Sequence, residues 1–562
     1  MVLDKPWLKS YPESVPAEID VDEYRSILDI FEQSCAQYRE RTAYINFGRE
    51  MSYGELDRLT RDFAAWLQAR GLRKGDRIAL MMPNVLQYPV ALFGAMRAGL
   101  VIVNTNPMYT QRELRHQLTD SGARAIVVVE NTAAVLESVL SEVPVEVVVT
   151  TGVGDLLGFP KGALINFTLR HVKKAVPGYA LPDAVSFRQA LNEGAKLKLE
   201  SVDLTHDDIA FLQYTGGTTG VAKGAMLTHR NLIANMLQSK AWMIPSGIGK
   251  NTEIIVTALP LYHIFALTAN CLVYMALGGV NLLITDPRNM KGFVSELGKI
   301  PFTVLTGVNT LFNALLNTPG FAQLDFSSLK GSLGGGMAVQ RAVAERWKKV
   351  TGTTLVEAYG LTETSPAACI NPMDLEEYNG CIGLPVPSTE CGLMNEAGEL
   401  LAQGEVGELV VRGPQVMKGY WQRPEETAKV LSGDGWLRTG DVATMTQDGF
   451  FRIVDRKKDM ILISGFNVFP NEIEDVTAMH PKVLEVAAVG VPDEKSGEAV
   501  KVFVVKSDPS LTEDELREYW SHELTAYKRP RRVEFRDELP KSNVGKILRR
   551  VLRDEATDRG PD

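Results

Sequence analysis

Glycines, threonines and one lysine gather in the segment YTGGTTGVAKG at residues 214–224. The glycines let backbone amides come close to a polyphosphate, the hydroxyls add hydrogen-bond donors, and Lys223 adds a positive charge. A Walker A loop has its lysine directly after the last glycine, whereas Lys223 precedes Gly224. A flexible surface linker would need neither the threonines nor the strand-like IAFLQ that comes before them. The segment therefore predicts a phosphate-binding loop that is not a Walker A loop.

Four further segments carry side chains suited to nucleotide chemistry: YGLTE at 359–363, GWLRTGD at 435–441, DRKKD at 455–459 and PKSNVGK at 540–546. Taken alone, each has a plain structural explanation, such as a helix cap, a turn aspartate or a solvated lysine. Lys546, however, follows Gly545 in a polar loop, within a stretch at 526–550 that has nine Lys or Arg and three Asp or Glu. Such a loop suits contact with a phosphate, although most charged runs are solvated faces.

The elements that must position these segments alternate between strand-like and helix-like stretches. RIALMMPN, LVIVN and AIVVVE, between residues 77 and 130, are typical of strands, and helix-period stretches separate them. This order predicts βαβ units and a largely parallel sheet, and it continues through EIIVTALP, FTVLTGV and TTLVEAYG. Each apolar run ends in a glycine or polar loop, which is where open α/β sheets bind ligands.

The pattern changes near residue 383. Residues 383–454 contain short strands and turn residues, as expected of an antiparallel region. After DRKKD, a segment with KVFVV, the acidic helix TEDELREYWSHEL and a basic tail has the size of a small α+β domain. We therefore expect an α/β fold with a large N-terminal domain, residues 1–454, of parallel-rich sheets with helices plus a small antiparallel region. A small α+β C-terminal domain, residues 455–562, follows it.

Composition limits the class of protein. The chain has 562 residues, 45% of them hydrophobic and 23% charged, which is typical of a globular protein with several domains. A net charge of −9 argues against a nucleic-acid partner, because binding to the phosphate backbone needs a dense basic face. The five cysteines include no CxxC pair, so neither a zinc site nor a disulfide framework is indicated. The N-terminal segment has no apolar secretory core, so we expect a cytoplasmic protein.

Two apolar stretches bear on membrane contact. Residues 264–284 carry no charge and are long enough to span a bilayer, but Gly278 and Gly279 interrupt them and Asn270 lies in the middle. We therefore expect a buried helix, a turn and a strand there. Within 163–176, Ile165, Leu169, Val172 and Val176 recur at helical spacing opposite three basic residues, Arg170, Lys173 and Lys174. This helix either packs on the body of the protein or lies peripherally on the inner face of an anionic membrane.

Taken together and in this order, the five segments resemble those of the acyl-adenylate-forming superfamily of CoA ligases, luciferases and peptide-synthetase adenylation domains. The stretch from GWLRTGD to DRKKDMI is most similar to bacterial long-chain fatty-acid CoA ligases. The resemblance implies an enzyme that uses ATP and Mg²⁺ to join a long-chain fatty acid to coenzyme A through acyl-AMP, releasing AMP and pyrophosphate, as a step toward β-oxidation. Such chemistry needs positioning and charge neutralisation more than a protein nucleophile.

The resemblance also implies the catalytic residues. Lys546 would bridge the fatty-acid carboxylate and the α-phosphate, and Thr362 would lie near that phosphate. Thr218 and Glu363 would hold Mg²⁺, which prefers oxygen ligands. Tyr359 would stack on the adenine. The other ATP-binding residues would be Tyr214, Thr215, Gly216, Gly217, Thr219, Gly220, Lys223, Gly335, Glu357, Ala358, Gly360, Asp441 and Arg456, of which Asp441 would accept hydrogen bonds from the ribose hydroxyls.

A mobile C-terminal domain is part of the same resemblance. Asp455 would be the hinge, and the small domain would rotate after adenylation to bring Gly465, Phe466 and Asn467 to the coenzyme A channel. His263 would be the substrate gate, and Gly307 and Val308 would line the acyl tunnel, although apolar runs are more often part of the core. Without the resemblance, His263 would be expected to be a core histidine.

Three alternatives remain open at this stage. The same scaffold could act on medium-chain or aryl acids, or stop at the adenylate. A P-loop-type NTPase would release ADP, and a silent lipid-binding protein would not turn over. A homodimer is a further state that the sequence leaves open.

Overall fold

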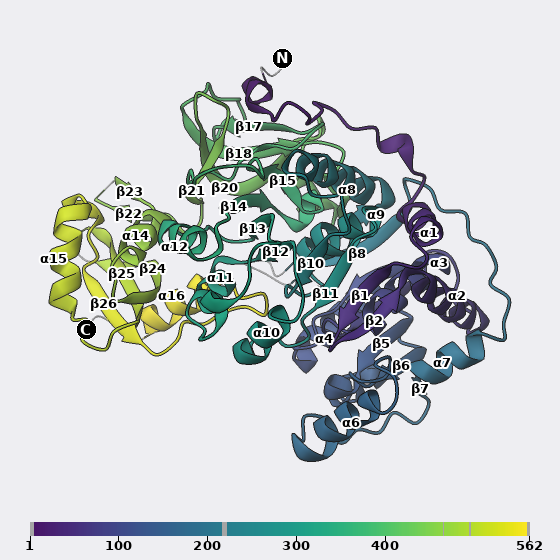
Figure 1. Cartoon of the computed structure of the whole chain (residues 1–562). Coiled ribbons are helices and arrows are strands. Elements are labelled where there is room, and N and C mark those ends of the chain that lie inside the picture. Colours follow the sequence, from purple (N-terminus) through teal and green to yellow (C-terminus); the bar gives the residue numbers. More distant parts are fainter. Residues whose placement is uncertain (1–4, 216–221, 465, 494–495, 559–562) are drawn as a thin grey trace.

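The computed structural model describes residues 5–215, 222–464, 466–493 and 496–558 (Figure 1). It has a mixed α/β fold with a large N-terminal domain and a smaller C-terminal domain, as the alternation of elements predicts. The helices are α1 (Ile27–Gln37), α2 (Tyr53–Ala69), α3 (Gln87–Arg97), α4 (Gln111–Ser121), α5 (Ala133–Glu137), α6 (Lys161–Phe167), α7 (Phe187–Gly194), α8 (His229–Met243), α9 (Val273–Ala276), α10 (Met290–Leu297), α11 (Asn309–Leu316), α12 (Arg341–Thr351), α13 (Pro424–Val430), α14 (Pro470–Ala478), α15 (Glu513–Glu523) and α16 (Arg549–Asp558).

The first large sheet is parallel through its centre, because helices cross over between β3, β4, β5, β6 and β8. Its central strands are buried on both faces and consist almost entirely of apolar residues, as parallel sheets require. In spatial order, the strands are β19 (Gly419–Tyr420), β9 (Lys223–Thr228), β8 (Ile209–Thr215), β4 (Val101–Asn104), β3 (Arg77–Met81), β5 (Ala125–Val129), β6 (Val147–Thr151) and β7 (Val185–Ser186).

The second large sheet is also parallel at its centre and antiparallel at its edges. Its parallel strands β12, β13 and β14 end at Gly307, Gly335 and Gly360, so the ends of these three strands share one edge of the sheet. In spatial order, the strands are β16 (Leu384–Pro385), β15 (Ala367–Ile370), β14 (Leu355–Gly360), β13 (Gly331–Gly335), β12 (Val304–Gly307), β10 (Ile254–Thr257), β11 (Val280–Leu283), β1 (Thr42–Asn46) and β2 (Arg49–Ser52).

The antiparallel region predicted after residue 383 is confirmed. It contains a sheet of β17 (Glu390–Met394), β18 (Val406–Arg412), β20 (Leu437–Met445) and β21 (Phe451–Arg456). Every neighbouring pair in this sheet runs antiparallel. Asp441 of β20 lies directly opposite Arg456 of β21, which brings two of the predicted ATP-binding residues together.

The C-terminal domain has its own hydrophobic core. Two clusters of buried side chains draw only on residues between Ile461 and Ala556. Its sheet contains β22 (Ile461–Ile463), β23 (Phe466–Val468), β24 (Val483–Asp493), β25 (Gly497–Lys506) and β26 (Arg532–Arg536). Figure 1 shows this domain beside α11 and α12 of the large domain. Asn313 of α11 donates a hydrogen bond to the Leu484 carbonyl, and the Arg341 amide at the start of α12 donates one to Asp475.

One local expectation is corrected: LTHRNLIANMLQ, from residue 227, is predicted from the sequence to be helical directly after the phosphate-binding segment. The phosphate-binding segment is not followed directly by a helix, because β9 intervenes and pairs antiparallel with β8. The segment therefore joins the two strands of a hairpin, with Thr215 opposite Lys223. Helix α8 begins only at His229, where Thr228 caps it. Residues 223–228 form a strand because they pair with β8 on one side and with β19, the edge strand of the same sheet, on the other.

The apolar stretch at 264–284 folds as expected. A π-helical segment, Ala266–Leu272, continues into α9, the chain turns at Gly278, and β11 follows. Asn270 is buried and accepts a hydrogen bond from Thr306, so its polar group is satisfied within the protein. Among the described residues, no helix is both long enough and apolar enough to cross a membrane.

The basic amphipathic stretch differs from the expectation. Ile165 and Leu169 pack against the main core, but Val172 is exposed and Val176 lies beyond the helix. The helix changes from α to π geometry at Thr168 and ends at Val172, so the spacing that aligned these residues is not maintained. Of the four apolar residues predicted to lie on one face of a helix, only Ile165 and Leu169 therefore pack against the core.

Candidate active site

The ends of β8 and β9 hold the flanks of the predicted phosphate loop. Gly216, Gly217, Thr218, Thr219 and Gly220 lie outside the described residues. On the incoming strand, the hydroxyl of Tyr214 donates a hydrogen bond of 2.7 Å to Asp120. Burial raises the pKa of Tyr214, so this hydroxyl stays protonated. The hydrogen bond fixes the strand from which the loop departs.

Lys223, on the outgoing strand, has a counter-ion. Its Nζ lies 2.5 Å from Oε2 of Glu426 and 4.9 Å from the centre of the Tyr420 ring. Glu426 also pairs with Lys429, and the hydrogen bonds from both lysines lower the pKa of Glu426 to about 2. The ammonium of Lys223 is therefore held at the base of the hairpin by residues of β19 and α13.

Tyr359, Asp441 and Arg456 form one connected group. The Tyr359 hydroxyl donates a hydrogen bond of 2.6 Å to Oδ2 of Asp441, and Nε of Arg456 lies 3.1 Å from Oδ1. Asp441 is only 3% exposed, while Arg456 is nearly half exposed. The structure thus brings together three residues that lie far apart in the sequence and that were predicted for adenosine recognition.

Close backbone packing surrounds Tyr359. A Cβ built on Gly360 would lie 1.9 Å from the carbonyl oxygen of Pro366, and one on Gly335 would lie 3.2 Å from that of Ala358. Glycine is therefore required at position 360 for the strands to approach. Glu357 is buried in the same strand, and burial raises its pKa to about 8. The Tyr378 hydroxyl and the Val339 amide donate to its carboxylate.

Glu363 lies in a single 3₁₀ turn, Thr362–Thr364, directly after β14. Its Oε1 accepts a hydrogen bond of 2.6 Å from the Tyr420 hydroxyl, and its backbone carbonyl accepts one from Met417. Among the described residues, no hydrogen bond or ion pair reaches Oε2. The turn therefore places one hard oxygen donor beside the group formed by Tyr359 and Asp441.

The loop that carries Lys546 reaches this site from the C-terminal domain. A Cβ built on Gly336 would lie 3.1 Å from Cε and 3.5 Å from Nζ of Lys546, and Gly336 has a positive φ of 79°. Burial lowers the pKa of Lys546 to about 8; the charge of Arg456 lowers it further, and the charges of Asp441 and Glu363 oppose the shift. These residues are therefore close enough to act on one another electrostatically.

His263 lies close enough to Lys546 for the charge of the lysine to act on its imidazole. Burial, with the nearby charge of Lys546, lowers the pKa of His263 to about 3, so the ring is neutral. Its Nδ1 accepts a hydrogen bond from the Phe265 amide. Val308, after β12, contacts the glycine loops on both sides, since a Cβ on Gly336 or Gly545 would meet its methyl groups at 3.8 and 3.1 Å. Gly307 lies under Phe312, whose ring carbon would meet an added Cβ at 3.0 Å.

Asp455 lies inside β21 and not in a turn. It is fully buried, and its carboxylate accepts hydrogen bonds from the amides of Arg456 and Asn471. Burial raises its pKa to about 6, although Arg549 of the C-terminal domain lies 3.4 Å away and opposes the shift. The connection between the domains is therefore a charged, hydrogen-bonded junction in this arrangement.

The residues predicted for coenzyme A lie on the surface of the C-terminal domain. Phe466 and Asn467 are exposed in β23, and Phe466 stacks on Tyr527 at 5.0 Å between ring centres. Gly465 lies outside the described residues. In this arrangement the domain presents Lys546 to the site and leaves β23 in solvent.

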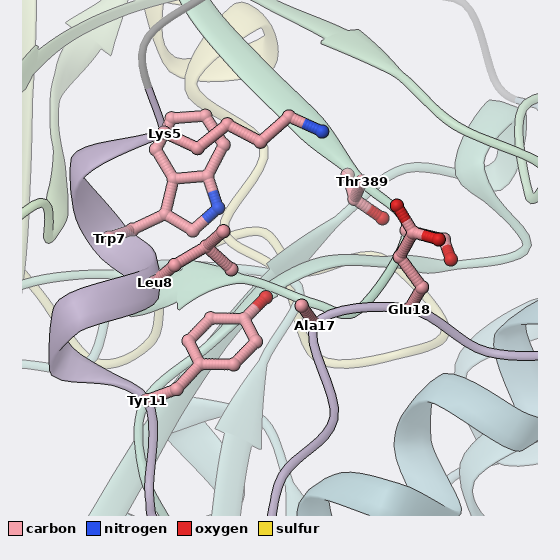
Figure 2. A pocket seen from close by; sticks show the side chains of 8 residues that line it. Lys5, Trp7, Leu8, Tyr11, Ala17, Glu18 and Thr389 are labelled. Carbon is pink, nitrogen blue, oxygen red and sulfur yellow. The ribbon is translucent and has the colours of Figure 1, made fainter.

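A separate cavity lies under the N-terminal segment (Figure 2). It has a volume of about 30 Å³ and is lined by Lys5, Trp7, Tyr11 and Thr389, among others. That volume corresponds to about one water molecule. This cavity is therefore too small for a nucleotide or an acyl chain.

Four contact residues were not predicted from the sequence: Asp120, Thr310, Tyr420 and Glu426. Thr310 donates a hydrogen bond of 2.8 Å to the Gly545 carbonyl, next to Lys546. None of the four lies in one of the five motifs, and each acts on a motif residue through a contact between distant segments. The GYWQRPEE segment, with an aromatic residue and charges before a helix, was the available signal for Tyr420 and Glu426.

Comparison with known proteins is consistent with this geometry. Residues 31–421 match the family model described as AMP-binding enzyme, and residues 472–546 match the model of the AMP-binding enzyme C-terminal domain. A long-chain-fatty-acid–CoA ligase of Escherichia coli O157:H7 is 60% identical over 555 residues, which cover 99% of both chains. The crystal structure of an anthranilate CoA ligase in complex with anthranoyl-AMP has a TM-score of 0.84 at 25% identity, covering 96% of this chain and 99% of the other. ATP-bound MatB from Rhodopseudomonas palustris has a TM-score of 0.79 at 28% identity, covering 95% of this chain and all of the other.

Proposed function

The chain belongs to the AMP-binding enzyme family, and from this premise we propose that it ligates long-chain fatty acids to coenzyme A. The enzyme forms an acyl-adenylate from the fatty acid and ATP, and the thiol of coenzyme A then displaces AMP. A free carboxylate resists nucleophiles, whereas its mixed anhydride with AMP has a good leaving group. We also propose that the thioester product is consumed by β-oxidation, as the family resemblance implies.

One observation carries the proposal for the site. Lys546 comes from the C-terminal domain, yet its side chain contacts Gly336 at the edge of the second large sheet, within electrostatic range of Asp441 and Glu363. A buried ammonium directed at the ends of parallel strands is suited to neutralising phosphate and carboxylate oxygens. This placement supports the role of Lys546 in bridging the two reactants.

The adenosine would bind beside Tyr359 and Asp441. Asp441 would accept hydrogen bonds from the ribose hydroxyls, and Arg456 would hold its carboxylate in place, as their 3.1 Å contact suggests. In this site, the backbone of Gly335, Glu357, Ala358 and Gly360 would surround the base. The polyphosphate would lie along the hairpin of Tyr214, Thr215 and Lys223, on the loop of Gly216, Gly217, Thr218, Thr219 and Gly220.

Mg²⁺ fits the oxygen donor that Glu363 provides. Mg²⁺ is usually bound by one or two carboxylates together with substrate phosphates and water. Oε1 of Glu363 is engaged by Tyr420, which orients the carboxylate toward a ligand at Oε2. Glu363 would hold the ion, with Thr218 as a further ligand, and Thr362 would lie near the α-phosphate. Bound Mg²⁺ supplies charge neutralisation of the phosphate oxygens.

The acyl chain would enter past His263. The neutral imidazole presents no charge to an apolar chain, and Val308, next to the Lys546 loop, would line the passage together with Gly307. Burial of each CH₂ contributes about 0.8 kcal/mol, so chain length would change affinity steeply. Preference for long chains over medium-chain or aryl acids would then follow from the length of this passage.

Rotation of the C-terminal domain would complete the reaction. We take Asp455 as the hinge between residues 1–454 and 455–562, where a few residues would absorb the change in φ and ψ. Breaking the contact of Asp455 with Arg549 would release the domain. Rotation would then bring β23, with Phe466 and Asn467, and the adjoining Gly465 to the site for attack by coenzyme A.

Peripheral contact with the inner membrane face is a further proposal. Phe159 is 92% exposed, and Leu164, Phe167 and Val172 are also mostly exposed on the same segment. Exposed Lys173 and Lys174 lie at its end, although the protein as a whole is acidic. Apolar side chains flanked by lysines suit an anionic leaflet, where fatty acids dissolve. In Figure 1, α6 lies at the outer end of the molecule.

The test of the function is the nucleotide product. The ligase should convert ATP to AMP and pyrophosphate only with a fatty acid, and acyl-CoA should appear only when coenzyme A is added. Release of ADP would support an NTPase instead, and a lack of turnover would support a lipid-binding protein. Sedimentation of the purified chain distinguishes a monomer from a homodimer.

A further inference from the structure

Tyr420 contacts two residues proposed to bind the nucleotide, yet it lies outside all five motifs. Its hydroxyl donates a hydrogen bond of 2.6 Å to Oε1 of Glu363, and the ammonium of Lys223 lies 4.9 Å from the centre of its ring. The side chain is buried, and its hydroxyl is the donor in this hydrogen bond. One side chain thus connects the proposed metal ligand with the lysine of the phosphate loop.

The backbone of Tyr420 is fixed to the same hairpin. Tyr420 pairs with Ala225 across the β19–β9 ladder, and the Trp421 amide donates a hydrogen bond of 2.8 Å to the Gly224 carbonyl. The Tyr420 amide donates to the Thr427 hydroxyl at 2.9 Å, which ties the strand to α13. The position of Tyr420 is therefore set by the strand that leaves the phosphate loop.

Two neighbours in the same segment act on the hairpin as well. Arg423 pairs with Asp120 at 2.7 Å, and Asp120 accepts the hydrogen bond from Tyr214 at the start of the loop. Glu426 is the counter-ion of Lys223. Residues 420–426 therefore contact both flanks of the loop as well as Glu363.

We propose that Tyr420 is a positioning residue for the magnesium-bound nucleotide, which orients Glu363 through its hydroxyl and supports Lys223 with its ring. The inference rests on the proposed function. With Oε1 engaged, the carboxylate cannot rotate freely, and Oε2 would be the oxygen that binds the ion. Partners of this kind typically change metal affinity by about 10- to 100-fold when removed.

The test uses Tyr420→Phe, which keeps the ring but removes the hydroxyl. Binding of ATP is measured by titration calorimetry without fatty acid, once with Mg²⁺ and once with EDTA. We expect affinity for ATP with Mg²⁺ to fall by about 10- to 100-fold, and affinity in EDTA to change by less than about threefold. Tyr420→Leu, which also removes the ring beside Lys223, should weaken binding under both conditions.

The matched control is Tyr179→Phe, which removes a tyrosine–glutamate hydrogen bond of 3.1 Å to Glu130, far from the site. It should leave both affinities unchanged. In a Glu363→Gln background, Tyr420→Phe should have little further effect, because the two residues act as one unit. Fully additive effects, or an unchanged affinity in Tyr420→Phe, would overturn the inference.

The design separates this inference from the proposed function. If the wild-type protein binds no ATP, the proposed function fails. If the wild type binds ATP equally well in Mg²⁺ and EDTA, the assignment of Glu363 as a metal ligand fails. Thermal denaturation of each variant shows whether it is folded. If Tyr420→Phe does not fold, the affinity for ATP with Mg²⁺ is measured for Tyr420→Leu with and without Glu363→Gln, and this comparison decides.

Discussion

The hydroxyl of Thr310 donates a hydrogen bond of 2.8 Å to the carbonyl of Gly545, and this contact joins the two domains next to Lys546. Gly545 has a positive φ of 84°, and a Cβ there would lie 2.9 Å from the Thr310 hydroxyl. Only glycine therefore fits both the turn and the approach. We propose that this arrangement, with Lys546 at the strand ends, is the one that carries out adenylation.

Replacement of Lys546 should separate the two half-reactions. Lys546→Ala removes one preorganised positive charge, so we expect adenylation to fall by about 100- to 1000-fold. Attack of coenzyme A on supplied acyl-adenylate should largely survive. Pyrophosphate release and acyl-CoA formation are measured separately, and an equal loss in both would contradict the assignment.

The pH dependence of adenylation follows from the lowered pKa of Lys546, about 8. The protonated ammonium is the active form, so kcat/KM for ATP should fall above pH 8, where an ordinary lysine would still be charged. Lys546→Arg should remove this alkaline limb, because arginine stays protonated. An identical alkaline limb in both enzymes would assign the titration to another group.

Asp441→Asn should weaken ATP binding specifically. The change removes the charge that accepts a hydrogen bond from Tyr359 and pairs with Arg456, and a hydrogen bond to a charged group is worth about 1.5–3 kcal/mol. We expect KM for ATP to rise by about 10- to 100-fold, with KM for the fatty acid unchanged. Glu390→Gln is the matched control, because Glu390 and Arg412 form a cross-strand pair elsewhere in the same sheet. A similar rise in the control would point to a general loss of sheet stability.

Cross-linking should trap the adenylating arrangement. The Arg341 amide and the Asp475 carboxylate are 3.1 Å apart across the domain contact, and the five native cysteines are buried. A short thiol cross-linker applied to Arg341→Cys with Asp475→Cys should leave one turnover of pyrophosphate release and abolish acyl-CoA formation. Each single variant, treated alike, should keep both activities. Acyl-CoA formation by the cross-linked enzyme at the normal rate would refute domain rotation.

Membrane binding should depend on the exposed apolar segment. Phe159→Ser with Phe167→Ser should reduce flotation with liposomes that contain phosphatidylglycerol, and Lys173→Glu with Lys174→Glu should reduce it most at low salt. Leu197→Ser with Val406→Ser removes exposed apolar side chains elsewhere and serves as the control. Flotation equal to wild type in both test pairs would exclude this surface.

The order of helices and strands was largely predictable from the sequence, because the buried strands of a parallel sheet consist of short runs of apolar residues. RIALM, VIVN and AIVVV are strands β3, β4 and β5 as expected. Strand β9 after the phosphate loop was missed, because KGAMLT alternates only weakly and its partner β19 lies almost two hundred residues away. Edge pairing of this kind depends on tertiary contacts that the local sequence does not contain.

The motif residues could be singled out from the sequence, but the contacts that support them could not. Tyr359, Asp441 and Arg456 lie far apart in the sequence and contact one another in the structure. Tyr420 contacts Glu363 and Glu426 pairs with Lys223, and both contacts join segments that lie far apart in the sequence. In the helix after Lys161, the change to π geometry altered the spacing on which the amphipathic prediction rested.

The most direct measurement of the central claim is a two-step single-turnover experiment with hexadecanoic acid and ATP. Without coenzyme A, the wild-type enzyme should release one equivalent of pyrophosphate and retain hexadecanoyl-AMP, detectable by mass spectrometry. Adding coenzyme A should convert that intermediate to hexadecanoyl-CoA and free AMP. Formation of ADP, or of thioester without a preceding acyl-AMP, would contradict the account.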